Sequence, residues 1–221
     1  MITLVVEAST YAGSVALLQG SALLGERSVV MRGKEHEALM AAVAELLAEC
    51  GRVPSDIERV VCGAGPGSFT SLRIAGSIAK GIALASGATL VPVSSLALLV
   101  ASREPRVPGR YLAVADAMRC EHYVQTFESE PDGELRVIGE LLVVSAALVR
   151  RIASDLSAIP LGPGRVGAEL VMPHARGAAY ITQLIDAAEP ANLAEWEPRY
   201  GRLAEAQVKW ESTHGRPLQW R

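Results

Sequence analysis

Apolar positions recur along this chain with two different periods, which predicts a mixture of strands and helices. Near the N-terminus, three apolar runs separated by short turn-like stretches predict an antiparallel meander. Further on, apolar positions recur at helical spacing, and short apolar runs typical of buried strands follow. The elements expected in the first half are strands at 2–8, 13–18, 22–31, 59–62 and 89–93, and helices at 35–50, at 70–86 and from Ser94 or Ser95 onward.

The periodicity is lost between residues 102 and 110, where two prolines and a glycine are typical of a linker. We place a domain boundary there, between an N-terminal domain of residues 1–104 and a C-terminal domain of residues 105–221. Strands open the second half as they open the first, which predicts a duplicated α/β fold resembling that of the actin-like ATPases. The elements expected after the linker are strands at 111–115, 122–127 and 135–144, a turn at 131–133, and helices at 145–156 and 177–188.

A glycine-rich turn, residues 63–68, joins a strand to the second long helix. It lacks the lysine of a P-loop, because Phe69 and Thr70 stand in that place. It also lacks the acidic residue of a dinucleotide-binding fold, since none occurs between Glu58 and Glu104. Pro66 removes one N–H donor that an anion cradle would use. The pattern favours a structural turn, with Ser68 or Thr70 capping the helix, over an anion site.

Both long helices carry more apolar surface than one buried face requires. The first has a core stripe of Leu39, Val43, Leu46 and Cys50, and the second has one of Ile74, Ile78, Ile82 and Ala85. Their remaining faces are also apolar or small, which leaves two interpretations: the helices are sandwiched inside the domain, or they form a helical interface with another protein. These second faces consist of Met40, Ala41, Ala44 and Ala48, and of Leu72, Gly76, Ala79 and Ala83.

Composition narrows the class of protein. Half of the 221 residues are apolar, which is enough for a substantial core. The first apolar run is cut by Glu7, and no run reaches the roughly twenty apolar residues of a membrane span. Three widely spaced cysteines indicate neither a disulfide framework nor a zinc site, so we expect a reducing cytoplasm. The net charge of −3 gives no global attraction to nucleic acid.

Few side chains are arranged for chemistry. The four histidines are isolated, and none pairs at the spacing that places two imidazoles on one metal. Glu7 ends the first strand, where actin-like ATPases hold metal and phosphate through an aspartate, although a strand-end carboxylate often only meets a neighbouring N–H. Asp116 and Glu121 could form an acid–base pair or a salt-bridged turn. The weak candidates for cofactor binding are Glu7, Ser9, Gly67 and Ser68.

The glycine-rich turn is part of a longer motif, Gly63-Ala64-Gly65-Pro66-Gly67-Ser68-Phe69-Thr70-Ser71-Leu72-Arg73-Ile74. Shorter motifs accompany it: Val6-Glu7-Ala8-Ser9-Thr10, Ser14-Val15-Ala16-Leu17, Glu35-His36, Val93-Ser94-Ser95-Leu96, Asp116-Ala117-Met118-Arg119-Cys120-Glu121 and Glu197-Pro198-Arg199-Tyr200. Together these motifs resemble those of the TsaB family, the dimerisation subunits of the bacterial tRNA threonylcarbamoyladenosine machinery, earlier described as glycoprotease-like. The resemblance is dense over residues 1 to 125 and thin beyond, and the first motif is its most specific element.

The resemblance implies two actin-like lobes of the ASKHA, ribonuclease H-like class, each a mixed sheet with helices. It implies a non-catalytic subunit that pairs with the catalytic subunit TsaD, which transfers threonylcarbamoyl to adenosine 37 of tRNAs reading codons that begin with A. A TsaE-type ATPase joins the assembly, ATP and metal belong to the partner subunits, and tRNA is met only through the complex. The interface residues expected, also for a homodimer, are Met40, Ala44, Ala48, Leu72, Arg73, Gly76, Ala79 and Ala83.

Two positions depart from the family pattern, which usually has aspartate where Glu7 stands and glycine where Ser71 stands. The longer carboxylate argues further against an inherited magnesium site. One alternative is an active small-molecule kinase or ATPase of the actin-like class that uses Glu7 and the glycine-rich turn. A peptidase is a third interpretation, for which the sequence supplies neither a metal site nor a nucleophile.

Overall fold

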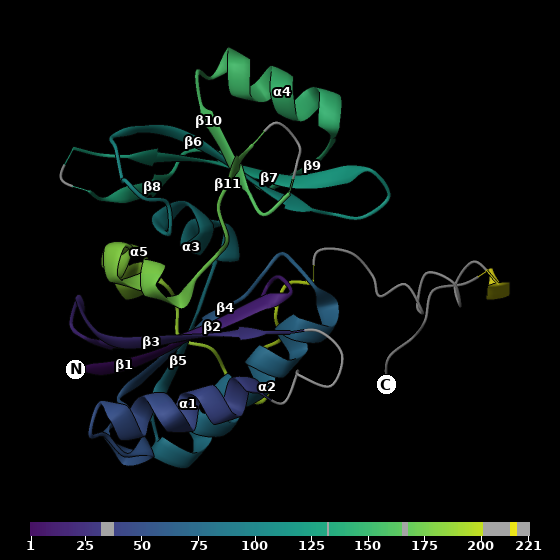
Figure 1. Cartoon of the computed structure of the whole chain (residues 1–221). Coiled ribbons are helices and arrows are strands. Elements are labelled where there is room, and N and C mark those ends of the chain that lie inside the picture. The colour runs from purple at the N-terminus through teal and green to yellow at the C-terminus, as the bar shows by residue number, and fades with distance from the viewer. Residues whose placement is uncertain (32–37, 132, 165–167, 201–212, 216–221) are drawn as a thin grey trace.

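Two mixed β-sheets, one from each half of the chain, lie one above the other with helices between and outside them (Figure 1). The computed structural model describes residues 1–31, 38–131, 133–164, 168–200 and 213–215. Among them, no helix has both the length and the apolar character that crossing a membrane requires.

The first sheet has the strand order β3-β2-β1-β4-β5. Its first three strands pair antiparallel, which confirms the predicted meander, while β4 and β5 continue parallel to β1. The strands are β1 (Ile2–Glu7), β2 (Ala12–Gln19), β3 (Ala22–Val30), β4 (Arg59–Gly63) and β5 (Thr89–Val93).

The second sheet repeats this plan. Strand β7 pairs antiparallel with β6 on one side and with β8 and β9 on the other, while β10 and β11 continue parallel to β6. The duplicated α/β fold is therefore confirmed. The strands are β6 (Gly109–Asp116), β7 (Glu121–Ser129), β8 (Leu135–Val137), β9 (Leu142–Ser145), β10 (Ile159–Gly162) and β11 (Glu169–Leu170).

The helices cover the sheets in layers. α1 (Ala38–Glu49) and α2 (Phe69–Ser86) lie against the outer face of the first sheet, and α4 (Ala146–Asp155) lies against the outer face of the second (Figure 1). α3 (Ser95–Ala101) lies between the sheets and is buried at all seven positions, because apolar strand residues meet it from both sides. Ser94, one of the two predicted start positions, caps this helix by accepting a hydrogen bond from the Leu96 N–H (3.2 Å). A short 3-10 turn, η2 (Pro54–Asp56), precedes β4.

Two predicted elements are broken in the structure. The strand expected at 135–144 forms β8 and β9, because Val137 pairs with Phe127 and Leu142 with Val124, so this edge has two more residues than β7 between those pairs. The helix expected at 177–188 forms a 3-10 helix, η3 (Ala175–Tyr180), and α5 (Thr182–Ala187). Buried Ile181 interrupts it with φ −126° and ψ 31°. The expected helix start at Glu35 and His36 lies outside the described residues.

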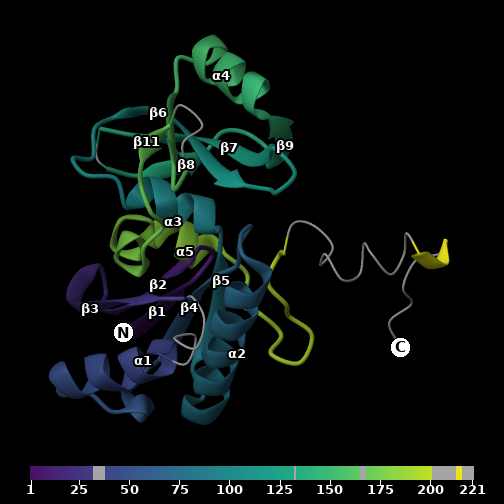
Figure 2. The same ribbon diagram turned by 45° about the vertical axis from the view of Figure 1, so that its right-hand side comes forward.

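The segment after β11 returns to the first sheet. η3 and α5 lie between the two sheets, beside α3, and their buried side chains join the core shared by both halves (Figure 2). Residues 104 and 105 lie between the last strand of the first sheet and the first strand of the second. That the two halves are separate domains stays a prediction.

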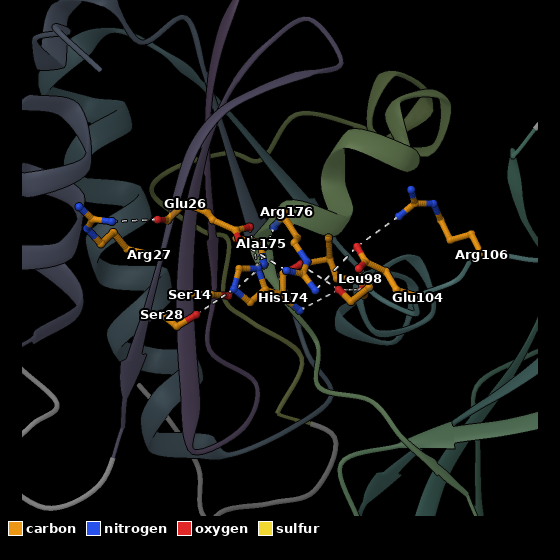
Figure 3. Close-up of polar contacts among 11 residues, drawn as sticks. Ser14, Glu26, Arg27, Ser28, Leu98, Glu104, Arg106, His174, Ala175 and Arg176 are labelled. Atoms are coloured by element: carbon orange, nitrogen blue, oxygen red, sulfur yellow. Dashed lines mark hydrogen bonds and ion pairs between the residues drawn. The ribbon is translucent and has the colours of Figure 1, made fainter. Parts of the chain in front are cut away.

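Side-chain hydrogen bonds fasten η3 to both neighbours. The Ala175 N–H donates to Ser14 Oγ on β2 (2.9 Å), and the His174 N–H donates to Ser102 Oγ after α3 (3.1 Å). Figure 3 shows His174 at the centre of this junction. Its Nδ1 accepts from the Arg176 N–H (3.1 Å), and its Nε2 lies 2.9 Å from Ser28 Oγ.

Burial lowers the pKa of His174, although the Glu26 carboxylate, 3.7 Å from Nδ1, opposes this shift. The folded protein therefore binds this proton less readily than the unfolded chain, in which histidine titrates near pH 6.5. Stability is then lost as the pH falls below that value. We expect His174→Asn, which keeps the acceptor for the Arg176 N–H, to remove this dependence. Urea unfolding from pH 8 to pH 5 tests it, and a wild-type advantage that grows on acidification would contradict it.

Candidate functional site

Glu7 is completely buried at the end of β1, in contact with the glycine-rich turn. Its Oε1 accepts a hydrogen bond from the Ser9 N–H (2.5 Å), and its Oε2 accepts one from Ser95 Oγ (2.8 Å). A Cβ at Gly63 would overlap Oε2. Both carboxylate oxygens are thus engaged inside the protein, and neither opens to a ligand.

Burial raises the pKa of Glu7 above its usual value of 4.5, with the hydrogen bonds from Ser9 and Ser95 opposing. As the pH rises from 4.5, the unfolded chain releases its proton before the folded protein does, so stability falls. The neutral variant Glu7→Gln lacks this loss. We therefore expect its unfolding free energy, relative to wild type, to improve with rising pH. Urea titrations at several pH values measure this difference, and a pH-independent difference would contradict it.

The glycine-rich turn is closed by the chain itself. The Ala64 N–H donates to Val93 O (2.7 Å), and the Gly65 N–H donates to Ser95 Oγ (3.0 Å). The four weak cofactor candidates come together here: the Ser68 N–H donates to Ser9 O (2.7 Å), and a Cβ at Gly67 would overlap that same oxygen.

The fold therefore brings these four residues together, but their polar groups mainly form hydrogen bonds within the protein. Ser68 occupies the N-cap position of α2 without a side-chain hydrogen bond to the helix backbone. Its hydroxyl lies 3.1 Å from that of Ser71, which is fully buried. The expected capping by Ser68 or Thr70 is thus replaced by a pair of hydroxyl groups.

The residues present do not fit a metal and nucleotide site at this place. Glu7 has no free oxygen, and within the described ranges no three His, Cys, Asp or Glu side chains gather as metal ligands would. The neighbouring Cys62 thiol is buried too, and burial with the nearby Glu7 charge raises its pKa, so it stays protonated. The arrangement serves to hold β1, β4, α3 and the start of α2 together.

The second face of α1 is exposed. Met40, Ala41, Ala44 and Ala48 point to solvent, and half of the Met40 surface is accessible (50%). The core stripe of Leu39, Val43 and Leu46 is buried as predicted. Of the two interpretations that the sequence left open, α1 therefore shows an uncovered apolar face.

The second face of α2 is covered. Leu72, Gly76, Ala79 and Ala83 are buried, partly because residues 191–200 of the chain cross this helix. A Cβ at Gly76 would lie 3.0 Å from Pro198 Cγ. On α2 this predicted second face is therefore covered within the protein, and a partner surface built on the exposed residues excludes these four positions.

A different stripe of α2 faces solvent. Arg73, Ser77, Gly81 and Leu84 are exposed at helical spacing, and Leu84 is one of the most exposed large apolar residues (77%). Only Arg73 was among the predicted interface residues. Ser77, Gly81 and Leu84 were not among them. A large apolar residue such as Leu84 among small ones is a sequence signal for an exposed contact position. Which stripe of α2 faces solvent, however, depends on residues 191–200, which lie far away in sequence.

Comparisons with known proteins agree with this fold and these motifs. The family model described as TsaD, tRNA N6-adenosine threonylcarbamoyltransferase, matches residues 32–156, more than half of the chain. The tRNA threonylcarbamoyladenosine biosynthesis protein TsaB of Bacillus subtilis is 27% identical over 95% of this chain and 98% of its own length. TsaB of Escherichia coli is 32% identical over 60% of this chain and 58% of its own length.

Among solved structures, YeaZ from Pseudomonas aeruginosa superimposes with a TM-score of 0.75 at 27% identity, covering 89% of this chain and 98% of that one. A second structure, of a protein described as similar to peptidase YeaZ from Pseudomonas aeruginosa, gives a TM-score of 0.77 at 27% identity. It covers 91% of this chain and 99% of that one. The chain therefore belongs to the family of the tRNA N6-adenosine threonylcarbamoyltransferase TsaD, and within it to the TsaB proteins.

Proposed function

We propose that this chain is a non-catalytic scaffold and activator of tRNA threonylcarbamoyladenosine synthesis, which acts by pairing with a TsaD-type catalytic subunit. The names of the relatives from Bacillus subtilis, Escherichia coli and Haemophilus influenzae support the role in this biosynthesis. The partner transfers threonylcarbamoyl to adenosine 37 of tRNAs that read codons beginning with A. ATP and metal bind to the partner subunits rather than to this chain.

The observation that carries the pairing is the solvent-facing side of α1 and α2. Both helices cover the same face of the first sheet, and their buried residues belong to one core. On the opposite side they expose Met40, Ala44, Ala48, Gly81 and Leu84. Small residues let a second pair of helices approach closely, and exposed apolar patches on otherwise polar surfaces mark contact sites. We call these five residues, with Ala41 and Ser77, the helix-pair surface.

The scaffold role is favoured over a kinase or ATPase by the state of Glu7 and the glycine-rich turn. A nucleotide site needs carboxylate oxygens open to a metal and N–H groups open to phosphate. In this chain the Glu7 oxygens and the N–H groups of Ala64, Gly65 and Ser68 are engaged by other parts of the protein. We expect titration of the isolated chain with Mg-ATP to give neither tight binding nor hydrolysis.

The assembly that we propose is cytoplasmic. A TsaE-type ATPase joins it, and tRNA is held through the complex, since the chain's formal charge of −3 gives little attraction to phosphate. Alone, the chain uses the helix-pair surface to form a homodimer.

Light scattering on a mixture with the TsaD-type subunit tests the pairing. The expected result is a one-to-one complex that replaces the homodimer, because both use the same surface. Two species that elute separately at micromolar concentrations, each with its own mass, would overturn the proposal.

A further inference from the structure

Residues 191–200, which we call the strap, run along α2 on the side away from α1 (Figure 2). One end is fixed by the Ala191 N–H, which donates to Leu90 O of β5 (2.8 Å). The other end is fixed by the Arg199 N–H, which donates to Ala64 O in the glycine-rich turn (2.7 Å). Between them the chain turns at Asn192, whose side-chain oxygen accepts from the Ala194 N–H (3.0 Å).

The strap packs closely against two glycines, Gly65 and Gly76. A Cβ at Gly65 would overlap the carbonyl oxygen of Arg199, and Pro198 is buried against Gly76. Trp196 adds part of its ring to the core beneath the first sheet. Backbone hydrogen bonds, Pro198 and the Trp196 ring all hold the strap against α2, so the strap is a fixed part of the α2 surface.

The last residue of the strap completes an aromatic and cationic cluster on the first turns of α2. The rings of Tyr200 and Phe69 lie 4.6 Å apart, centre to centre. The Arg73 guanidinium lies over both rings, 5.2 Å from the centre of Phe69 and 6.0 Å from that of Tyr200. Arg73 is exposed, and with the described residues it forms no ion pair. A guanidinium held over rings keeps its N–H groups free in a fixed orientation.

The cluster continues the helix-pair surface. Arg73 precedes Ser77, Gly81 and Leu84 on the same exposed stripe of α2, so the strap borders this stripe at the end nearest the glycine-rich turn. We propose that the strap presents Phe69, Arg73 and Tyr200 to the TsaD-type partner, where Arg73 donates hydrogen bonds to a carboxylate of that partner. This inference rests on the proposed function and assigns a role to the Glu197-Pro198-Arg199-Tyr200 motif.

A protein partner fits the cluster better than RNA does. Arginine and aromatic side chains together form the hot spots of protein interfaces, where a few residues carry most of the affinity. RNA affinity needs many phosphate contacts at once, whereas this chain is acidic overall, and Glu195 and Glu197 lie on the strap itself.

Binding of three variants to the TsaD-type subunit, measured by calorimetry with the full-length chain, tests the inference. We expect Arg73→Ala and Tyr200→Ala each to weaken the affinity about ten-fold or more. Tyr200→Phe keeps the ring and should recover most of the affinity that Tyr200→Ala loses. Arg151→Ala on α4, which removes an exposed arginine in the other lobe, serves as the matched control and should bind as wild type does. Circular dichroism checks that each variant is folded.

The outcomes separate this inference from the proposed function. If wild type fails to bind the subunit, the proposed function itself fails. If wild type binds while folded Arg73→Ala and Tyr200→Ala bind equally well, only the role of the cluster is refuted. Unchanged affinity for the subunit together with weakened binding of tRNA would also refute it, since the cluster would then contact RNA. Should Tyr200→Ala be unfolded, Arg73→Ala and the charge reversal Arg73→Glu decide the result.

Discussion

Replacing Ala44 with arginine is expected to abolish pairing with the TsaD-type subunit while leaving the chain folded. Ala44 is exposed on the helix-pair surface, so the free chain accommodates the longer side chain in water. In a close helix contact the same side chain would bury an unpaired charge, which weakens binding by about 100-fold or more. Calorimetric titration of the variant with the subunit measures the loss, and thermal unfolding measures the stability of the variant alone.

The matched control is Ala147→Arg, the same change at an exposed position of α4 in the other lobe. It should leave the affinity for the subunit unchanged. Ala79, another of the predicted interface residues, is fully buried, so arginine there would disrupt the fold and would not report on pairing. Wild-type affinity in a folded Ala44→Arg variant would contradict the placement of the surface on α1.

Gly63→Ala is expected to destabilise the chain strongly. The new Cβ would overlap Glu7 Oε2 and approach Ser95 Oγ to 2.9 Å. Glu7 is fully buried and held by two hydrogen bonds, so it cannot move aside without losing them. We expect a loss of about 3 kcal/mol or more in unfolding free energy, from overpacking together with broken buried hydrogen bonds. Chemical denaturation measures it.

Two further variants separate this steric effect from a general intolerance of alanine. Gly81→Ala adds a methyl to an open position of α2 and should stabilise the chain by about 0.5 to 1 kcal/mol, the usual preference of a helix for alanine. Glu7→Asp shortens the carboxylate, so it should restore part of the stability lost in Gly63→Ala, a coupling that a double-mutant cycle reports. A Gly63→Ala variant as stable as wild type would disprove the overlap.

The strands and the repetition of the same α/β arrangement in both halves could be predicted because they depend on apolar runs that are local in sequence. β1 to β3 are apolar runs joined by short turns, and each pairs with its neighbour in sequence. The broken helix at Ile181 could not be predicted in the same way. Its side chain is buried between the two sheets, and this tertiary contact outweighs the helical pattern of the residues on either side.

Helical periodicity located a second apolar face that is exposed on α1 but covered on α2, for a physical reason, and partner binding by either helix stays a prediction. On α1 nothing in the described structure covers the second apolar face, so counting residues around the helix was sufficient. On α2 the strap covers Gly76 from more than a hundred residues away in sequence, and helical periodicity carries no information about such a contact. Gly76, one of the small residues that suggested a partner, instead lies against Pro198 and Trp196.

Glu7 shows a similar limit. Its position at the end of the first strand suggested a carboxylate available for metal. Nothing local in the sequence indicates that Ser95, which is 88 residues away in the chain, would reach it. The closure of the turn by Arg199 is equally non-local. The glycines that resemble a phosphate loop are therefore explained by the carboxylate and the backbone that press against them.

Reconstitution of tRNA modification tests the scaffold role most directly. Purified TsaD-type and TsaE-type subunits, unmodified tRNA and threonylcarbamoyl-adenylate are combined with and without this chain, and threonylcarbamoyladenosine is measured by mass spectrometry of the digested tRNA. A scaffold and activator predicts that modification appears only when the wild-type chain is present and that Ala44→Arg fails to replace it. Equal modification in its absence would contradict the proposed function.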